Sequence, residues 1–212
     1  MPGNWATPPT FTVGETTGVT AALNTVGGNE NFLDNLLYDS GEIDNSRDYF
    51  DVASISTSYV HLLGLLIARS DDTSDSTGHV KVNCSLNGDV GNNYNTSFYA
   101  IKNDSVALDG VGGFSALAIA HMSFGFCPNA NAPAGAFGMC AFLLPSYHGA
   151  RWKTGISFFG LQPVRAVSGT SQMASGTGYG IWKSTSAITE VQVNAAPSKF
   201  VTGSRFSLYG LY

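Results

Sequence analysis

The feature that most constrains this chain is a series of short β-type segments that begins at Asp51 and runs to the C-terminus. Each segment is rich in Val, Ile, Phe, Tyr or Thr, and clusters of Gly, Asn, Asp and Ser separate them. No amphipathic helix pattern of about 10–15 residues stands between them, so the sequence predicts an antiparallel β-sandwich rather than βαβ units. A jelly roll is the favoured architecture. The expected strands are 52–57, 59–69, 79–86, 96–101, 137–144, 152–159, 180–183, 188–193 and 206–212.

Composition supports an all-β fold. Glycine, serine, threonine and asparagine supply 80 of the 212 residues, whereas glutamate occurs 4 times and lysine 5 times. These residues favour turns, caps and extended structure over helix interiors, which excludes a helical bundle or coiled coil. Aromatic residues make up 12 % of the chain. Any that the core cannot hold would have to cover an oligomer interface, where aromatic side chains are enriched.

Local patterns refine this picture at several places. Residues 62–68 are apolar on both faces of the expected strand, as in a strand that is covered on both sides. Apolar and polar side chains alternate along residues 188–193, so one face of that strand should be exposed to water. Asn87-Gly88 is a strong signal for a type I′ hairpin turn. The glycine-rich run 169–180 lacks the closing Lys-Ser/Thr of a phosphate-binding loop and predicts an inter-strand loop.

Residues 1–48 are expected to form an N-terminal arm, and residues 49–212 the sandwich domain. Pro8 and Pro9 keep residues 5–11 extended. Residues 19–24 and 31–38 can each form one or two helical turns, but such short helices are not stable alone. The arm must therefore pack on something, either its own domain or a partner.

Charge and cysteine usage limit the classes of partner. A net charge of −5 and a pI near 5.1 argue against nucleic-acid binding. Residues 1–5 do not resemble a signal peptide, and the longest apolar run, 62–68, is too short to cross a bilayer. Three cysteines without CxxC spacing predict buried thiols in a chain that folds in a reducing cytosol. We therefore expect a protein without membrane insertion.

The sequence contains no convincing catalytic motif. Residues 113–117 lack the second glycine of a nucleophile elbow. Cys140 with His148 matches no thiol–base signature. The C-terminal half offers only Glu190 toward the carboxylate pair of a glycoside hydrolase. We therefore predict that the chain is not an enzyme and has no cofactor.

One group of carboxylates leaves an alternative open. Asp71, Asp72 and Asp75 could hold calcium between strands, but the segment lacks the glycine and distal glutamate of an EF-hand loop. A solvated turn without a metal is the favoured interpretation of this segment.

Five segments of the chain have a distinctive sequence. They are WATP at 5–8, YVHLLGL at 59–65, VNCSLNGDVGNNY at 82–94, GIWKSTSAIT at 180–189 and FVTGSRFSLYGL at 200–211. Together, in this order, they resemble a family of tailed-bacteriophage virion proteins. Residues 111–150 depart from that resemblance, with a longer apolar stretch that contains Cys127 and Cys140.

The resemblance implies a non-enzymatic structural protein on the virion, folded in the host cytoplasm. It would be a capsid decoration (cement) protein or a head or tail fibre component. Its partners would be the major capsid protein or tail subunits, and it would form a homotrimer. Trp5, Phe11 and Leu23 would anchor the arm to the particle.

The alternative is a tail-fibre tip that binds a receptor or a host surface glycan, since a fold alone does not fix function. Exposed Trp or Tyr residues at loop ends, beside Asp and Asn, would favour it. Trp182 can distinguish the two interpretations. Its flanking residues indicate a position in the core, whereas an exposed Trp182 would be a platform for a carbohydrate ring.

Overall fold

The computed structural model describes residues 35–74, 78–103, 111–161, 166–167, 170–171, 173–195 and 197–212. Residues 36–212 make one compact unit. Its secondary structure is almost entirely β, in two main antiparallel sheets and one two-stranded ribbon. Among the described residues, no helix is long and apolar enough to span a membrane. The expected arm anchors Trp5, Phe11 and Leu23 lie outside the described residues.

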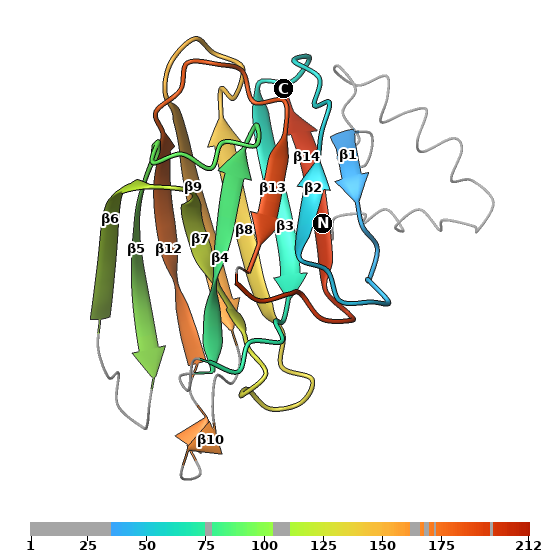
Figure 1. Ribbon diagram of the computed structural model, residues 1–212, viewed down its shortest axis with the longest axis vertical. Helices are drawn as coiled ribbons and strands as arrows, with labels where there is room; N and C mark the ends of the chain where they lie inside the picture. The colour runs from blue at the N-terminus through green and yellow to red at the C-terminus, as the bar shows by residue number, and fades with distance from the viewer. Residues whose placement is uncertain are drawn as a thin grey trace, which may run out of the picture. The chain divides into compact units, whose positions relative to one another are not determined.

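The larger sheet has eight strands (Figure 1). In spatial order they are β1 (Leu36–Asp39), β14 (Arg205–Leu211), β3 (His61–Ala68), β8 (Gly138–Pro145), β9 (Lys153–Leu161), β12 (Met173–Trp182), β5 (Tyr94–Asn103) and β6 (Val111–Ile119).

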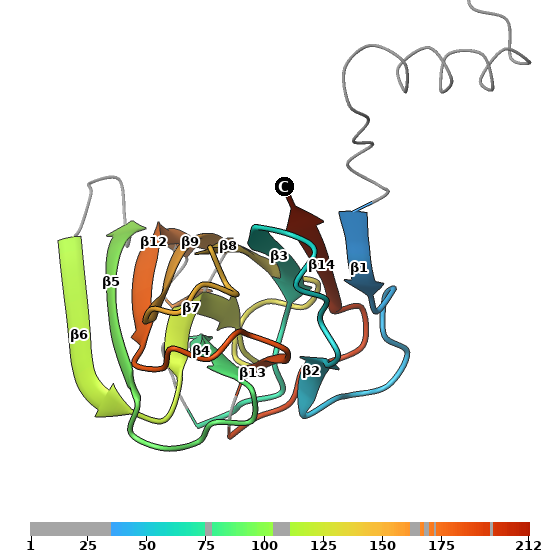
Figure 2. The ribbon, with the colours of Figure 1, turned by 90° about the horizontal axis from the view of Figure 1, so that it is seen from above.

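The smaller sheet has four strands and lies against one face of the larger sheet (Figure 2). The order of the smaller sheet is β2 (Tyr49–Val52), β13 (Val191–Asn194), β4 (His79–Leu86) and β7 (Met122–Pro128). The ribbon consists of β10 (Ala166–Val167) and β11 (Thr170–Ser171). Along the chain, consecutive strands pass repeatedly from one main sheet to the other.

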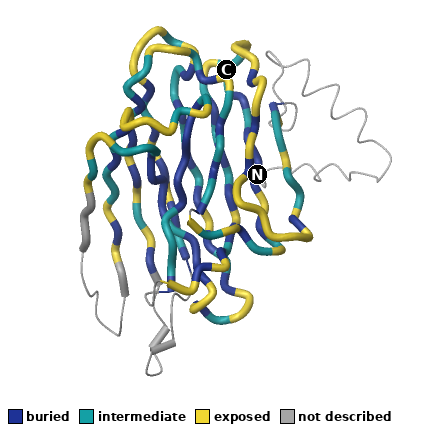
Figure 3. Tube along the Cα trace, in the orientation of Figure 1, coloured by how far each residue is buried: buried dark blue, intermediate teal, exposed yellow. Residues whose placement is uncertain are grey.

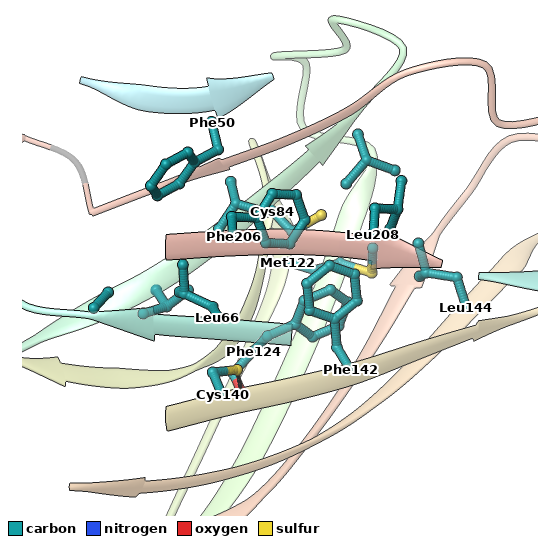
Figure 4. Packing of buried hydrophobic residues seen from close by; sticks show 14 of the residues in the cluster. Phe50, Leu66, Cys84, Met122, Phe124, Cys140, Phe142, Leu144, Phe206 and Leu208 are labelled. Carbon is teal, nitrogen blue, oxygen red and sulfur yellow. Dashed lines mark hydrogen bonds between the residues drawn. The ribbon is translucent and has the colours of Figure 1, made fainter. Parts of the chain in front are cut away.

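The core fills the space between the two sheets (Figure 4). Phe124 of β7 stacks on Phe142 of β8 with ring centroids 4.7 Å apart, and Phe142 stacks in turn on Phe206 of β14. Cys84, Cys127 and Cys140 are free thiols buried among these rings, as the sequence predicted. Burial of this apolar surface is the main force that holds the sheets together.

The glycine-rich run predicted as a loop is instead largely strand β12. Its alternate glycines, Gly176, Gly178 and Gly180, face inward where β7 crosses it. A Cβ on Gly180 would lie 2.5 Å from the sulfur of Met122 on β7, and one on Gly178 would lie 2.4 Å from Ser157 Oγ. Glycine is needed here for the close approach of two layers rather than for a turn.

Three other expectations differ from the structure. Residues 36–39 form the edge strand β1 rather than a helical turn, because Leu36 pairs with Tyr209 of β14. The first strand of the small sheet is β2 at 49–52 rather than 52–57, since Ser54 has a φ of 58° and leaves the extended region. Within residues 111–150 the expected strand 137–144 is confirmed as β8, but the strands β6 and β7 were not expected.

The expectation for residues 62–68 is wrong for the described chain. Burial alternates along β3, with Leu62, Gly64, Leu66 and Ala68 buried and the intervening side chains partly or fully exposed (Figure 3). The described chain covers only one face of this strand, although both faces are apolar.

Candidate interaction surface

The polar residues that the sequence singled out at the 87–94 turn hold the fold together. Asn87 has a φ of 53° and Gly88 one of 65°, as a type I′ turn requires. The turn does not form the predicted hairpin, because β4 and β5 on either side of it lie in different sheets. Asn87 Oδ1 accepts hydrogen bonds from the backbone N–H groups of Thr189 (2.8 Å) and Glu190 (3.1 Å), which ties the end of β4 to the start of β13. This part of the resemblance is therefore a structural motif.

Trp182 is a core residue, so the carbohydrate-platform interpretation is wrong. Its ring is buried and stacks on Tyr94. Its indole Nε1 donates a hydrogen bond to Asp89 Oδ2 at 2.7 Å. Burial raises the pKa of Asp89, but the hydrogen bonds from Trp182, Gly91 and Asn93 outweigh that effect and lower it.

The described residues of the candidate calcium and thiol sites take part in local structure. Asp71 Oδ1 accepts a hydrogen bond from the Lys199 N–H at 2.8 Å, and Asp72 Oδ1 accepts two from Ser74. Asp75 lies outside the described residues, among which no group of His, Cys, Asp and Glu could hold a metal ion. Cys140 points into the core, where burial raises its pKa to about 12, whereas His148 is exposed.

The feature that stands out is the face of the large sheet that points away from the small sheet. Strand pairing aligns the outward residues of β3, β8, β9, β12 and β5 in three rows. We call these residues the outer patch. Its rows are Ile67, Met139, Gly160, Ser175 and Ile101; Leu65, Ala141, Phe158, Thr177 and Tyr99; and Leu63, Leu143, Ile156, Tyr179 and Ser97.

The outer patch is apolar where a solvated sheet face is normally polar. Phe158 is 56 % exposed and Met139 55 %, and Ile67, Ile156, Tyr99 and Tyr179 are exposed as well. None of the residues in the patch carries a charge. A contiguous apolar surface of this kind marks an interaction site on soluble proteins.

An ion pair borders the patch at the edge of the sheet. Arg205 of β14 lies opposite Ile67 in the register and contacts the carboxylate of Asp39 on β1, with Nε 2.9 Å from Oδ1. The Arg205 hydrogen bond lowers the pKa of Asp39 to about 2, against a smaller opposing effect of burial. The patch therefore has an ion pair along one edge, where protein–protein interfaces carry polar residues.

The outward face of the small sheet has a different chemistry. Its paired rows are Asp51, Gln192 and Ser85, then Tyr49, Asn194 and Asn83. Tyr49 and Asp51 are exposed, Gln192 and Asn194 are half-buried, and Ser85 and Asn83 are buried. Beside them Glu190 lies in hydrogen-bond contact with Asp51, and burial together with that neighbour raises the pKa of Glu190. Such direct contact leaves no room for a substrate between the two carboxyl groups.

The sequence did not predict the outer patch, because large apolar residues occupy outward positions of the strand β9 and small residues occupy inward ones. In β9 the outward residues are Thr154, Ile156 and Phe158, while Gly155 and Ser157 face inward. Hydrophobic periodicity alone would have placed Ile156 and Phe158 in the core. The available signal was the pair Phe158-Phe159, which puts a large apolar ring on each face of one strand.

Comparisons with known proteins leave the family open. No family model and no curated protein matches the chain. Among solved structures, the CBM2 module of the evolved Dit of Lactobacillus casei BL23 phage J-1 aligns over 84 % of this chain and 77 % of its own length. The identity is 9 % and the TM-score 0.20, a level of similarity that supports no argument about fold or function.

Proposed function

We propose that this chain is a non-enzymatic structural protein of a tailed-phage virion, either a capsid decoration (cement) protein or a head or tail fibre component. The observation that carries the proposal is the uncharged, exposed outer patch, which suits assembly against neighbouring subunits. The ordered segments that resemble virion proteins support it from the sequence. Burial of surface between neighbouring subunits on the particle would stabilise the shell by mass action.

The order of the strands supports a jelly roll as the finer description of the fold. The small sheet has the strand order β2-β13-β4-β7. In the large sheet, once β8 and β9 are set aside, the corresponding order is β3-β12-β5-β6, and each of these strands is joined along the chain to a strand of the small sheet or to its neighbour. Two such interleaved Greek keys form a jelly roll. In this description β8 and β9 are an added hairpin, and β1 and β14 extend the edge.

Attachment by the N-terminal arm is part of the proposal. Trp5, Phe11 and Leu23 would anchor the arm on the major capsid protein or on a tail subunit. The outer patch and the arm would then have separate tasks, the patch in contacts between sandwich domains and the arm in contacts with the particle.

Immunogold electron microscopy of intact particles of the phage that encodes the chain tests the proposal. Label on the head would support decoration, and label along the tail would support a tail component. Particles that stay unlabelled while the lysate contains the protein would refute a virion role. Label confined to the tail tip would point instead to the receptor-binding alternative.

A triple variant tests the arm separately. Trp5→Ala, Phe11→Ala and Leu23→Ala together should abolish particle labelling and leave the melting temperature of the sandwich domain unchanged. Trp152→Ala, an exposed tryptophan within the sandwich, is the matched control and should leave labelling intact. Full labelling of the triple variant would refute attachment by the arm.

A further inference from the structure

The apolar outer patch needs an occupant. Strand β3 is apolar on both faces, the pattern of a strand covered on both sides, yet the described chain covers only the inner face. Phe158, Met139 and their neighbours would otherwise leave a broad apolar surface in water. We infer that a second copy of this chain covers the outer patch, face to face, with the two copies related by a two-fold axis.

Charge favours a second copy over a different partner. The outer patch carries no charge, so two copies meeting there would bury no unpaired charge. A partner of different chemistry is usually recognised through complementary charges, which this surface does not offer.

The dimensions of the sheet match a stable interface. Eight strands at a spacing of about 4.8 Å span about 34 Å, and strands of about eight residues are about 27 Å long, which gives about 900 Å² of sheet face. A standard interface buries about 800 Å² on each partner. The outer patch would form its apolar centre, and the Asp39–Arg205 pair would lie on the polar rim.

The geometry places Phe158 near the two-fold axis. It lies on β9, the middle strand of the five, and in the middle row of the patch. Two flat sheets pack about 10 Å apart, so side chains near the axis of such a pair face their own symmetry mates. Phe158 of one copy would therefore contact Phe158 of the other.

Sedimentation of the full chain over a range of concentrations tests the pairing. The wild type should be a dimer. Phe158→Lys and Phe158→Asp should each weaken dimerisation at least about 30-fold, because like charges would face each other across the axis. An equimolar mixture of the two variants should restore the dimer, because an ammonium group on one copy would then face a carboxylate on the other.

Two controls make the result decisive. Val90→Asp adds a charge at an exposed turn residue outside the patch and should leave the dimer intact. Since Phe158 is itself exposed, the variants should melt like the wild type at dilute concentration. A monomeric wild type, the trimer implied by the resemblance, or dimers that both charged variants retain would each overturn the inference. Because no particles are used, this outcome is independent of the virion test.

Discussion

The two outward faces of the sandwich differ sharply, although both belong to antiparallel sheets over the same core. The small sheet presents polar residues, of which Tyr49 and Asp51 are exposed and Gln192 and Asn194 half-buried. The large sheet presents an apolar, uncharged patch. The core requires neither choice, because outward side chains do not pack in it. The difference fits the second copy that we infer over the large sheet, since a second copy would remove the outer patch from water.

The largest difference in stability between the inner and outer faces is expected at two adjacent residues of β9, Phe158 and Phe159. Phe159 is 3 % exposed and packs against Phe126, whereas Phe158 points outward. Phe159→Ala should lower the free energy of unfolding by about 3–5 kcal/mol through the cavity it leaves. Phe158→Ala should cost less than about 1 kcal/mol at dilute concentration, as for a surface position.

Denaturant titration of both variants at low protein concentration measures the difference. Equal losses of stability would mean that Phe158 is already packed within one chain. The patch would then not be a free surface.

The β9 pair also shows where prediction from sequence reaches its limit. The alternation of side chains is a local property, so the strand itself was predictable from its residues. Which of the two alternating sets of β9 side chains faces inward depends on how closely β7 packs against the large sheet. Glycines on the neighbouring strand β12 allow that close packing. Periodicity cannot supply this information, because the largest side chains do not mark the inner face here.

A second test concerns the polar residues at the end of the small sheet, which are engaged within the chain. Asn87→Ala should cost about 2 kcal/mol, because alanine disfavours the left-handed backbone and two backbone N–H groups lose their acceptor. Asn92→Ala, an exposed residue in the same turn region, should change stability by less than about 0.5 kcal/mol. Thermal melting of both variants checks this, and equal stabilities would remove the structural role given to Asn87.

This turn was predictable because its signal is contained in adjacent residues. Asn87-Gly88 forms the predicted turn, but the predicted hairpin is wrong, because β4 before the turn and β5 after it lie in different sheets. Strand β1 could not be found in the same way, since Leu36–Asp39 is extended only through its pairing with β14, far away in the sequence. The arm anchors Trp5, Phe11 and Leu23 stay predictions, and the homotrimer that the resemblance implies is the alternative to the two-fold dimer that we infer.

The smallest effect is expected at the rim of the large sheet. The lowered pKa of Asp39 means that its ion pair stabilises the fold above the ordinary carboxyl value of 3.8 and that this stabilisation is lost as the pH falls through about 2. Asp39→Asn should therefore cost about 0.5–1 kcal/mol near neutral pH. Thermal melting from neutral to acidic pH should show the wild type and the variant converging near pH 2. A constant difference would contradict this role for Asp39.

Hydroxyl-radical footprinting of the full chain, dilute and concentrated, tests most directly whether the outer patch is an interface. Met139 and Trp152 have nearly equal exposure, 55 % and 56 %, but only Met139 lies in the patch. On concentration, oxidation of Met139 and Phe158 should fall several-fold while that of Trp152 stays unchanged. Unchanged oxidation of Met139 and Phe158 in an associated protein would contradict the account, because the copies would then meet through another surface.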